Sequence, residues 1–168
     1  MMIQIPTKAI AFDCEYVGVG IEGKDNMLAR ISIVNMYGHC IYDKYVKPVE
    51  KIIDYRTAIS GIRPKPFQKV QLEVHKLLTN RIVVGHSLKN DFKVLNLSHP
   101  RKLIRDTANY VPFRKALQIV KTPSLKLLAK KLLGIDIQSG EHDSITDARV
   151  AMKLYIMHRN RWENDIHR

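Results

Sequence analysis

The chain has 168 residues, of which 45% are apolar and 26% are charged. This size and composition predict a globular protein with a proper hydrophobic core and exclude the disordered class. No apolar run approaches the roughly 18 residues of a membrane span, and the first residues lack the order of a signal peptide. The two cysteines form no CxxC pair and no Cys/His cluster, which argues against a disulfide scaffold or structural zinc. We therefore expect a single domain over residues 1–168 in a reducing compartment, with no membrane association.

The net charge of +12 comes from 28 Lys and Arg against 16 Asp and Glu. The excess concentrates between His99 and Lys131, where nine basic residues accompany one acid, Asp106. Such a stretch favours a nucleic-acid partner because each phosphate contact releases a counterion, although a solvated surface of one sign is the alternative. Tyr110 and Phe113 lie within this stretch and are expected either to stack on bases or to pack in the core.

The hydropathy pattern predicts strands in the first part of the chain and an alternation of strands and helices after it. A short connection with Gly38 predicts a hairpin, Ser87 is expected to cap a helix, and Gly134 is expected to end one. A loop is expected over residues 47–66. The predicted fold class is α/β, with a mixed central sheet flanked by helices. The expected strands cover residues 8–15, 28–36, 40–46, 81–85 and 103–106, and the expected helices cover residues 67–78, 88–97, 124–133 and 144–159.

Two acids lie close together on the first predicted strand. Asp13 and Glu15 are two residues apart, so their side chains point to one face of the strand while Cys14 points to the other. Paired carboxylates repel each other unless a cation lies between them, and their hard oxygens suit Mg²⁺ or Mn²⁺. A D-x-E pair by itself is a weak signal, because most chains of this length contain one by chance.

Three further residues complete a possible site. Asp91 lies in the first turns of a predicted helix after a buried strand, where open α/β sheets place ligands, although an acid is also favourable near any helix start. Asp147 lies near the start of the last helix, where Ser144 and Asp147 also fit a capping box. His142 precedes that helix in a loop, and an imidazole with an ordinary pKa near 6.5 can accept a proton at neutral pH.

In combination these residues resemble the DEDDh group of 3′-to-5′ exonucleases. The motifs that carry the resemblance are AFDCEYVGVG with Asp13 and Glu15, VVGHSLKNDFKVL with Asp91, and HDSITDARVAM with His142 and Asp147. The segments ARISIVNMYG, YDKYVKP, DYRTAISGIRP and KLIRDTANY are also similar to the RNA exonuclease 4 family, a nuclear, nucleolus-associated group related to the interferon-induced exonucleases. The similarity covers nearly the whole chain.

The resemblance implies an RNase H-like fold and two divalent cations, Mg²⁺ or Mn²⁺. By this likeness Asp13, Glu15 and Asp147 would hold the first cation, and His142 would be the general base. Asp13 would hold the second cation with Asp91, which would act directly or through water. Family members usually carry Met where this chain has Tyr16. The positions that the family uses to hold the 3′-terminal nucleotide are here Tyr16, Leu28, Ala29 and Arg56. For Leu28 and Ala29, a place in the apolar core is the alternative.

The expected function is therefore that of a metal-dependent 3′-to-5′ exoribonuclease that releases nucleoside 5′-monophosphates. The resemblance implies a monomer that acts on the 3′ end of single-stranded RNA in ribosomal RNA processing, in the nucleus and nucleolus. One alternative is a DNA-directed, repair-type exonuclease. Another is a catalytically silent RNA-binding module of pre-ribosomes, against which the intact set of acids argues.

Overall fold

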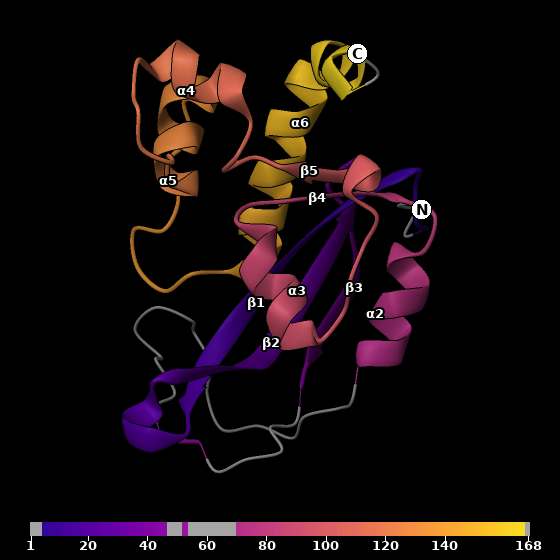
Figure 1. Ribbon diagram of the computed structural model, residues 1–168, viewed down its shortest axis with the longest axis vertical. Coiled ribbons are helices and arrows are strands. Elements are labelled where there is room, and N and C mark those ends of the chain that lie inside the picture. The colour runs from indigo at the N-terminus through magenta and orange to yellow at the C-terminus, as the bar shows by residue number, and fades with distance from the viewer. Residues whose placement is uncertain (1–4, 47–51, 54–69, 167–168) are drawn as a thin grey trace.

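The computed structural model describes residues 5–46, 52–53 and 70–166 (Figure 1). Its centre is a five-stranded sheet with the strand order β3-β2-β1-β4-β5. The first three strands run antiparallel, whereas β4 and β5 run parallel to β1, so the prediction of a mixed sheet is confirmed. The strands are β1 (Ala9–Val19), β2 (Asp25–Asn35), β3 (Cys40–Tyr45), β4 (Ile82–Gly85) and β5 (Ile104–Asp106).

The hairpin of β1 and β2 is longer than predicted. β1 continues past Glu15 to Val19, which pairs with Asp25 at the start of β2. The exposed polar side chains of Asp25 and Asn26 interrupt the apolar pattern and hide this start in the sequence. The register shifts between Glu15 and Tyr16 because β2 has an extra residue, Ala29, at this point, and such a bulge bends the strand that contains it.

Five helices and three short turns surround the sheet within the described residues. The helix α4 was not predicted, because it is short and lies in the basic stretch. The predicted helix over residues 124–133 begins with Ser124 as its cap, but continues as a π-helical turn, η3, and ends at Gly134. The elements are α2 (Gln71–Leu78), α3 (Leu88–Leu95), α4 (Val111–Leu117), α5 (Leu125–Leu128) and α6 (Ser144–Ile166), with η1 (Ile21–Gly23), η2 (Arg101–Leu103) and η3 (Ala129–Leu133).

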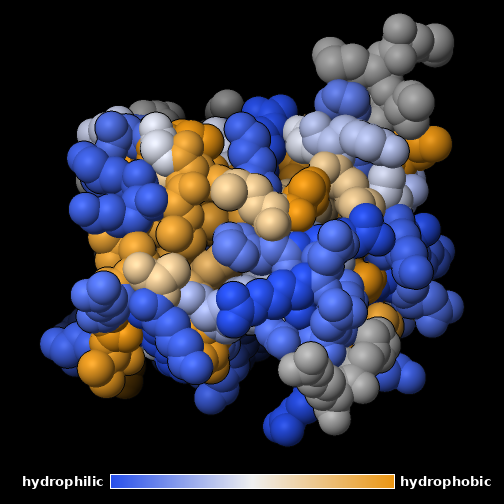
Figure 2. Space-filling model, turned by 90° about the horizontal axis from the view of Figure 1, so that it is seen from above, coloured by the Kyte–Doolittle hydropathy of each residue, from blue (hydrophilic) through white to orange (hydrophobic). Residues whose placement is uncertain are grey.

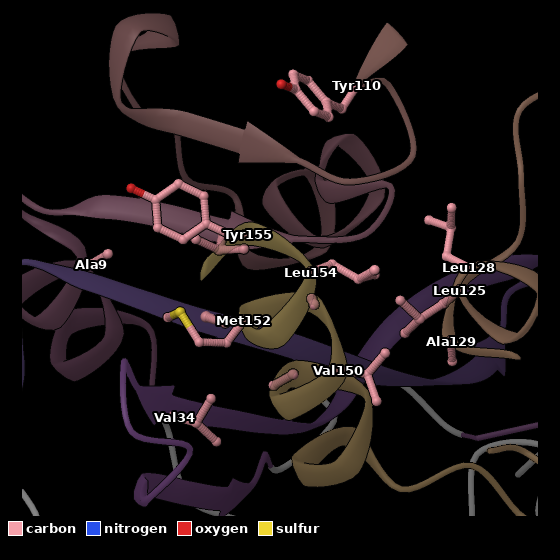
Figure 3. Close-up of a cluster of buried hydrophobic side chains, with 14 of the residues drawn as sticks. Ala9, Val34, Tyr110, Leu125, Leu128, Ala129, Val150, Met152, Leu154 and Tyr155 are labelled. Atoms are coloured by element: carbon pink, nitrogen blue, oxygen red, sulfur yellow. The ribbon is translucent and has the colours of Figure 1, made fainter. Parts of the chain in front are cut away.

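Separate hydrophobic cores lie on the two faces of the sheet. Ala9 and Ala11 of β1 face α6, whose Met152 and Tyr155 are buried against the sheet together with residues of α5 (Figure 3). Ile10 and Phe12 face the opposite side, where α2 and α3 pack. Because successive side chains of a strand alternate, Asp13 and Glu15 continue the face toward α6, and Cys14 continues the face toward α3.

An aromatic cluster fixes the C-terminal part of α6. Trp162 stacks on Tyr110 with ring centres 3.8 Å apart, and the completely buried Phe113 packs edge-on against both rings. Tyr110 and Phe113 are therefore core residues rather than an exposed platform for bases. These contacts, with an ion pair from the buried Arg105 to Glu163 at 2.6 Å, stabilise α6 beyond the end predicted at residue 159. None of the helices that the structure describes has the length and hydropathy needed to cross a bilayer.

Candidate active site

The candidate site lies where β1 loses its neighbour on the β4 side. The pairing of β1 with β4 ends at Ala11 and Val84, and α3 begins just beyond that point. Gly85 allows the end of β4 to lie close to β1 and to the first turn of α3. A Cβ at this position would lie 2.3 Å from Leu88 Cδ2 and 3.0 Å from the carbonyl oxygen of Phe12. As a result, α3 carries its first turns to the open edge of β1.

The start of α3 is held by the carboxylate of Asp106 on β5. Its two oxygens accept hydrogen bonds from the backbone nitrogens of Ser87, at 2.8 Å, and Leu88, at 3.2 Å. Ser87 itself is in the left-handed region, with φ 61°, and its side chain makes no capping bond, so the prediction that its hydroxyl caps the helix is wrong. The neighbouring strand β5 thus positions α3, and with it Asp91.

The start of α6 is organised differently from the predicted capping box. The carboxylate of Asp143 accepts hydrogen bonds from the backbone and the hydroxyl of Thr146, at 3.1 and 2.7 Å. Ser144 is buried and its hydroxyl is 2.7 Å from that of Ser32 on β2. Capping is therefore the task of Asp143, and Asp147 is available to the pocket.

One pocket brings the predicted acids and the histidine together. Ligand oxygens of Asp13, Glu15 and Asp147 lie within 4.8 Å of one another. Asp91 and His142 line the same pocket, which has a volume of about 250 Å³. The Nδ1 atom of His142 is 4.0 Å from Asp147 Oδ2. Residues from β1, α3, α6 and the preceding loop thus converge, as the sequence motifs indicate.

Burial and mutual repulsion make this pocket unfavourable for several negative charges. Burial, followed by the charge of Asp147, raises the pKa of Glu15 to about 8, and the cation of Arg30 only partly opposes this rise. Burial, followed by the charge of Asp91, raises the pKa of Asp13 well above its usual value. Burial raises the pKa of Asp91 to about 7 despite hydrogen bonds that favour its charged form.

The donor set fits divalent cations. The Oε1 atom of Glu15 is buried and has no hydrogen-bond partner among the described residues, so it can accept a cation. Asp13 lies near Asp91 as well as near Glu15 and Asp147, since the charges of all three raise its pKa. Carboxylate oxygens without Cys or His suit Mg²⁺ or Mn²⁺, and a shared carboxylate suits a pair of them.

Of the four residues predicted to contact the nucleotide, only Tyr16 lines the pocket among those that the structure describes. Its hydroxyl donates a hydrogen bond to Asp91 Oδ1. Leu28 and Ala29 are buried in hydrophobic clusters and do not line the pocket, as their alternative role as core residues predicts. Arg56 lies outside the described residues. The contacts of these side chains with a nucleotide stay predictions.

Gln138 is a pocket residue that sequence reasoning missed. Its side-chain Nε2 atom donates a hydrogen bond to Asp147 Oδ2 at 2.8 Å. Its backbone carbonyl oxygen accepts a hydrogen bond from Lys126 Nζ at 2.8 Å. A glutamine in a loop carries no motif, so its role depends on the path of residues 134–143. His86 and Asn90 also line the pocket without a signal of their own beyond their place near Asp91.

Arg30 connects the sheet to the loop that carries His142. It lies opposite Glu15 in the β1–β2 register. Its guanidinium donates to both oxygens of Asp43, at 2.8 and 3.0 Å, and to Asp143 Oδ1 at 3.1 Å. This bridge ties the cap of α6 to β2, and no spacing in the sequence indicated it.

The basic residues between His99 and Lys131 have different environments. Arg105 is only 2% exposed and is ion-paired with Glu163, so the expectation that it contacts phosphates is wrong. Lys121, Lys126, Lys130 and Lys131 are exposed on α5, η3 and the loop before them, beside Leu125 of the pocket. We call this group the α5 lysines.

A larger groove lies away from the acids. Its volume is about 770 Å³, and it lies between α3, α4 and the end of α6, with mainly apolar walls. Figure 2, seen from the end that carries α4 and the last turns of α6, shows an apolar area between hydrophilic side chains. The groove contains two acids, Asp106 and Asp165. The carboxylate of Asp106 already binds the start of α3, and that of Asp165 accepts a hydrogen bond from the Tyr110 hydroxyl at 3.4 Å. Hydrolytic chemistry therefore belongs to the smaller, acidic pocket.

The order of the strands and the acidic pocket at the edge of β1 agree with the expected RNase H-like fold. A model of the exonuclease (RNase_T) family matches residues 10–155, and the chain belongs to this family. The resemblance noted in the sequence is thereby confirmed.

Relatives with known names support this assignment. RNA exonuclease 4 of Homo sapiens is 54% identical over 164 residues, which cover 94% of this chain and 39% of the relative. RNA exonuclease 4 of Saccharomyces cerevisiae is 50% identical over 167 residues, or 96% of this chain and 57% of the relative. The Pan2 pseudoubiquitin hydrolase–RNA exonuclease module of the same yeast, solved with A7 RNA, is 37% identical with a TM-score of 0.80, and the match covers 96% of this chain and 30% of that one. The chain thus spans well under two thirds of each of these proteins.

Proposed function

We propose that this protein is a cation-dependent 3′-to-5′ exoribonuclease that releases nucleoside 5′-monophosphates. The observation that carries the proposal is the convergence of Asp13, Glu15 and Asp147 within 4.8 Å, in one pocket with Asp91 and His142. Relatives named RNA exonuclease 4 and a Pan2 exonuclease module solved with RNA support RNA as the substrate.

The side chains divide the work of hydrolysis between them. Asp13, Glu15 and Asp147 hold one cation, and Asp13 and Asp91 hold the other. When bound, the two cations would supply positive charge that acidifies the attacking water and stabilises charge on the leaving 3′ oxygen. His142 accepts the proton of the attacking water, and its position in a loop beside Asp147 lets it approach and withdraw.

The α5 lysines hold the strand upstream of the terminal nucleotide. Contacts to phosphates confer affinity without choosing a sequence, which suits an enzyme that removes one nucleotide after another. The small volume of the pocket, about 250 Å³, favours a single terminal nucleotide over an internal segment of a folded strand. That this terminus is the 3′ end is what the family resemblance implies.

Labelled oligonucleotides test the proposal. Single-stranded RNA labelled at its 3′ end should release label first as a mononucleotide in the presence of Mg²⁺ or Mn²⁺, and 5′-labelled RNA should shorten stepwise. Matched DNA should be degraded more slowly. Internal cuts, or no cleavage by the full chain with either cation, would contradict the proposal, and faster loss of DNA would favour a repair-type exonuclease.

Matched variants connect the activity to the pocket. Asp147→Asn should abolish turnover, whereas Glu22→Gln, which changes an exposed acid paired with Lys24, should leave it unchanged. His142→Ala should reduce kcat at neutral pH by at least a hundredfold and retain cation binding, with His75→Ala on α2 as the control. Retained turnover in Asp147→Asn would contradict the assignment of the ligands.

The sequence resemblance extends the proposal to a cellular role. We infer action as a monomer in ribosomal RNA processing, in the nucleus and nucleolus. Depletion in the source cells should lengthen the 3′ ends of ribosomal RNA precursors, and a tagged chain should collect in the nucleolus. Unchanged precursor ends would contradict the role in processing without affecting the assignment of the chemistry.

A further inference from the structure

Asp91 is held by side chains of the neighbouring strand. The hydroxyl of Tyr16 donates a hydrogen bond to Asp91 Oδ1, and the thiol of Cys14 also hydrogen-bonds this carboxylate. Both donors come from the face of β1 opposite to Asp13 and Glu15. Asp91 is only 3% exposed and lies near Asp13 at the open edge of β1. It is therefore hydrogen-bonded by two side chains from the face of β1 that packs against α3.

The geometry of β1 explains why Tyr16 can reach this carboxylate. The plain alternation of β1 places Tyr16 on the same face as Cys14, and its ring packs at the edge of the cluster between the sheet and α3. The ring is half-buried, so its packing limits the positions of its hydroxyl. A carboxylate offers about four acceptor sites, and one bond from a tyrosine leaves capacity for a cation.

We propose that Tyr16 is a positioning residue that fixes Asp91 for the second cation, the one Asp13 and Asp91 share, and thereby sets the affinity of that cation. The inference rests on the proposed function, because it assumes a pair of cations in this pocket. The hydroxyl selects one orientation of Asp91 before a cation arrives. Without it, the carboxylate must give up rotational freedom on binding, and the cation binds more weakly.

Comparable outer contacts in metal sites indicate the size of the effect. Groups that orient a ligating side chain typically contribute 10–100-fold to metal affinity. We therefore expect Tyr16→Phe to weaken the second cation at least tenfold. The first cation, held by Asp13, Glu15 and Asp147, should change less than twofold, because Tyr16 contacts none of those three carboxylates.

Calorimetric titration of the full chain with Mn²⁺ tests this inference without any substrate. Tyr16→Phe removes only the hydroxyl and keeps the ring, so the packing at α3 is retained. Tyr42→Phe is the matched control, since it removes a hydroxyl that bonds Glu73 of α2, away from the pocket. The wild type and Tyr42→Phe should each bind two Mn²⁺ ions, and the affinity of each site should be the same in both proteins. In Tyr16→Phe one of the two sites should bind Mn²⁺ more weakly.

A double-mutant cycle identifies the route of the effect. Asp91→Asn should abolish the second site, and adding Tyr16→Phe to it should change nothing further. Unchanged affinities in Tyr16→Phe, or a further loss in the double variant, would overturn the inference while leaving the proposed function intact. A wild type that binds fewer than two Mn²⁺ ions would overturn both, so the two failures are distinguishable.

Discussion

Replacement of Glu15 by Gln should stabilise the cation-free protein and weaken its response to cations. Glu15 is only 5% exposed, and its carboxylate lies within 4.8 Å of those of Asp13 and Asp147. One of its oxygens is buried without a hydrogen-bond partner among the described residues. Gln has nearly the same shape but no charge, and its amide can donate to a neighbouring carboxylate. The substitution therefore removes repulsion while it removes a ligand.

The pKa of Glu15 gives the magnitude. Its rise from 4.5 to about 8 corresponds to about 5 kcal/mol at 1.36 kcal/mol per pH unit. This value is an upper limit because water can enter the pocket, so we expect a gain of about 2–4 kcal/mol at pH 8. For a chain of this length the melting temperature should rise by roughly 5–15 °C.

The dependence on pH has a definite sign. Because the pKa is raised in the folded state, the associated stability is complete below about pH 4.5 and is lost as the pH rises through about 8. The cation-free wild type should therefore lose stability between pH 5 and pH 8, and Glu15→Gln should lose less over the same range. Thermal melts in EDTA across this range measure both proteins.

Addition of Mn²⁺ should reduce the difference in stability between the two proteins. A cation at a hundred times its dissociation constant stabilises the folded state by about 2.7 kcal/mol, and the variant should gain less than the wild type because it lacks one ligand. A variant that is less stable than the wild type in EDTA at pH 8, or that gains equally from Mn²⁺, would refute the reasoning.

Three further substitutions test other parts of the structure. Trp162→Ala removes the ring stacked on Tyr110 and should reduce the free energy of unfolding by about 3–5 kcal/mol in urea denaturation; a loss below 1 kcal/mol would contradict the packing argument. Arg30→Met frees Asp143 and should lower kcat more than it raises KM, with faster amide exchange in the first turn of α6; unchanged exchange would count against the bridge. Gln138→Ala should weaken the first cation about tenfold in calorimetry and leave the second unchanged, whereas an equal effect on both would exclude its role as a support for Asp147.

Much of the fold could be predicted because the signals were local. The alternation in β1 and β2, the turn at Gly38 and the αL residue Gly134 each reflect the conformation of a few neighbouring residues. The lengths of β1, β2 and α6 could not be predicted, because they depend on tertiary contacts. The pairing of Val19 with Asp25 extends the hairpin, and the contacts of Trp162 extend the helix.

The site was predictable as a set of residues but not as an arrangement. The spacing of Asp13 and Glu15 on a strand indicates a paired site. Asp91 and Asp147 could also be explained structurally, the first as an acid near a helix start and the second as part of a capping box. Asp106 and Asp143 turned out to provide the contacts at the two helix starts. Supporting residues such as Gln138 have no motif, because their position depends on how a distant loop folds back onto the pocket.

The central claim is that four carboxylates form a site for a pair of cations at the open edge of β1. Crystals grown with Mn²⁺ and a nucleoside 5′-monophosphate test it directly, because manganese is located by its anomalous scattering. We predict two peaks about 4 Å apart, with Asp13 between them, Glu15 and Asp147 on one and Asp91 on the other. The absence of manganese from the carboxylates of Asp13 and Glu15 at saturating concentration would contradict the account.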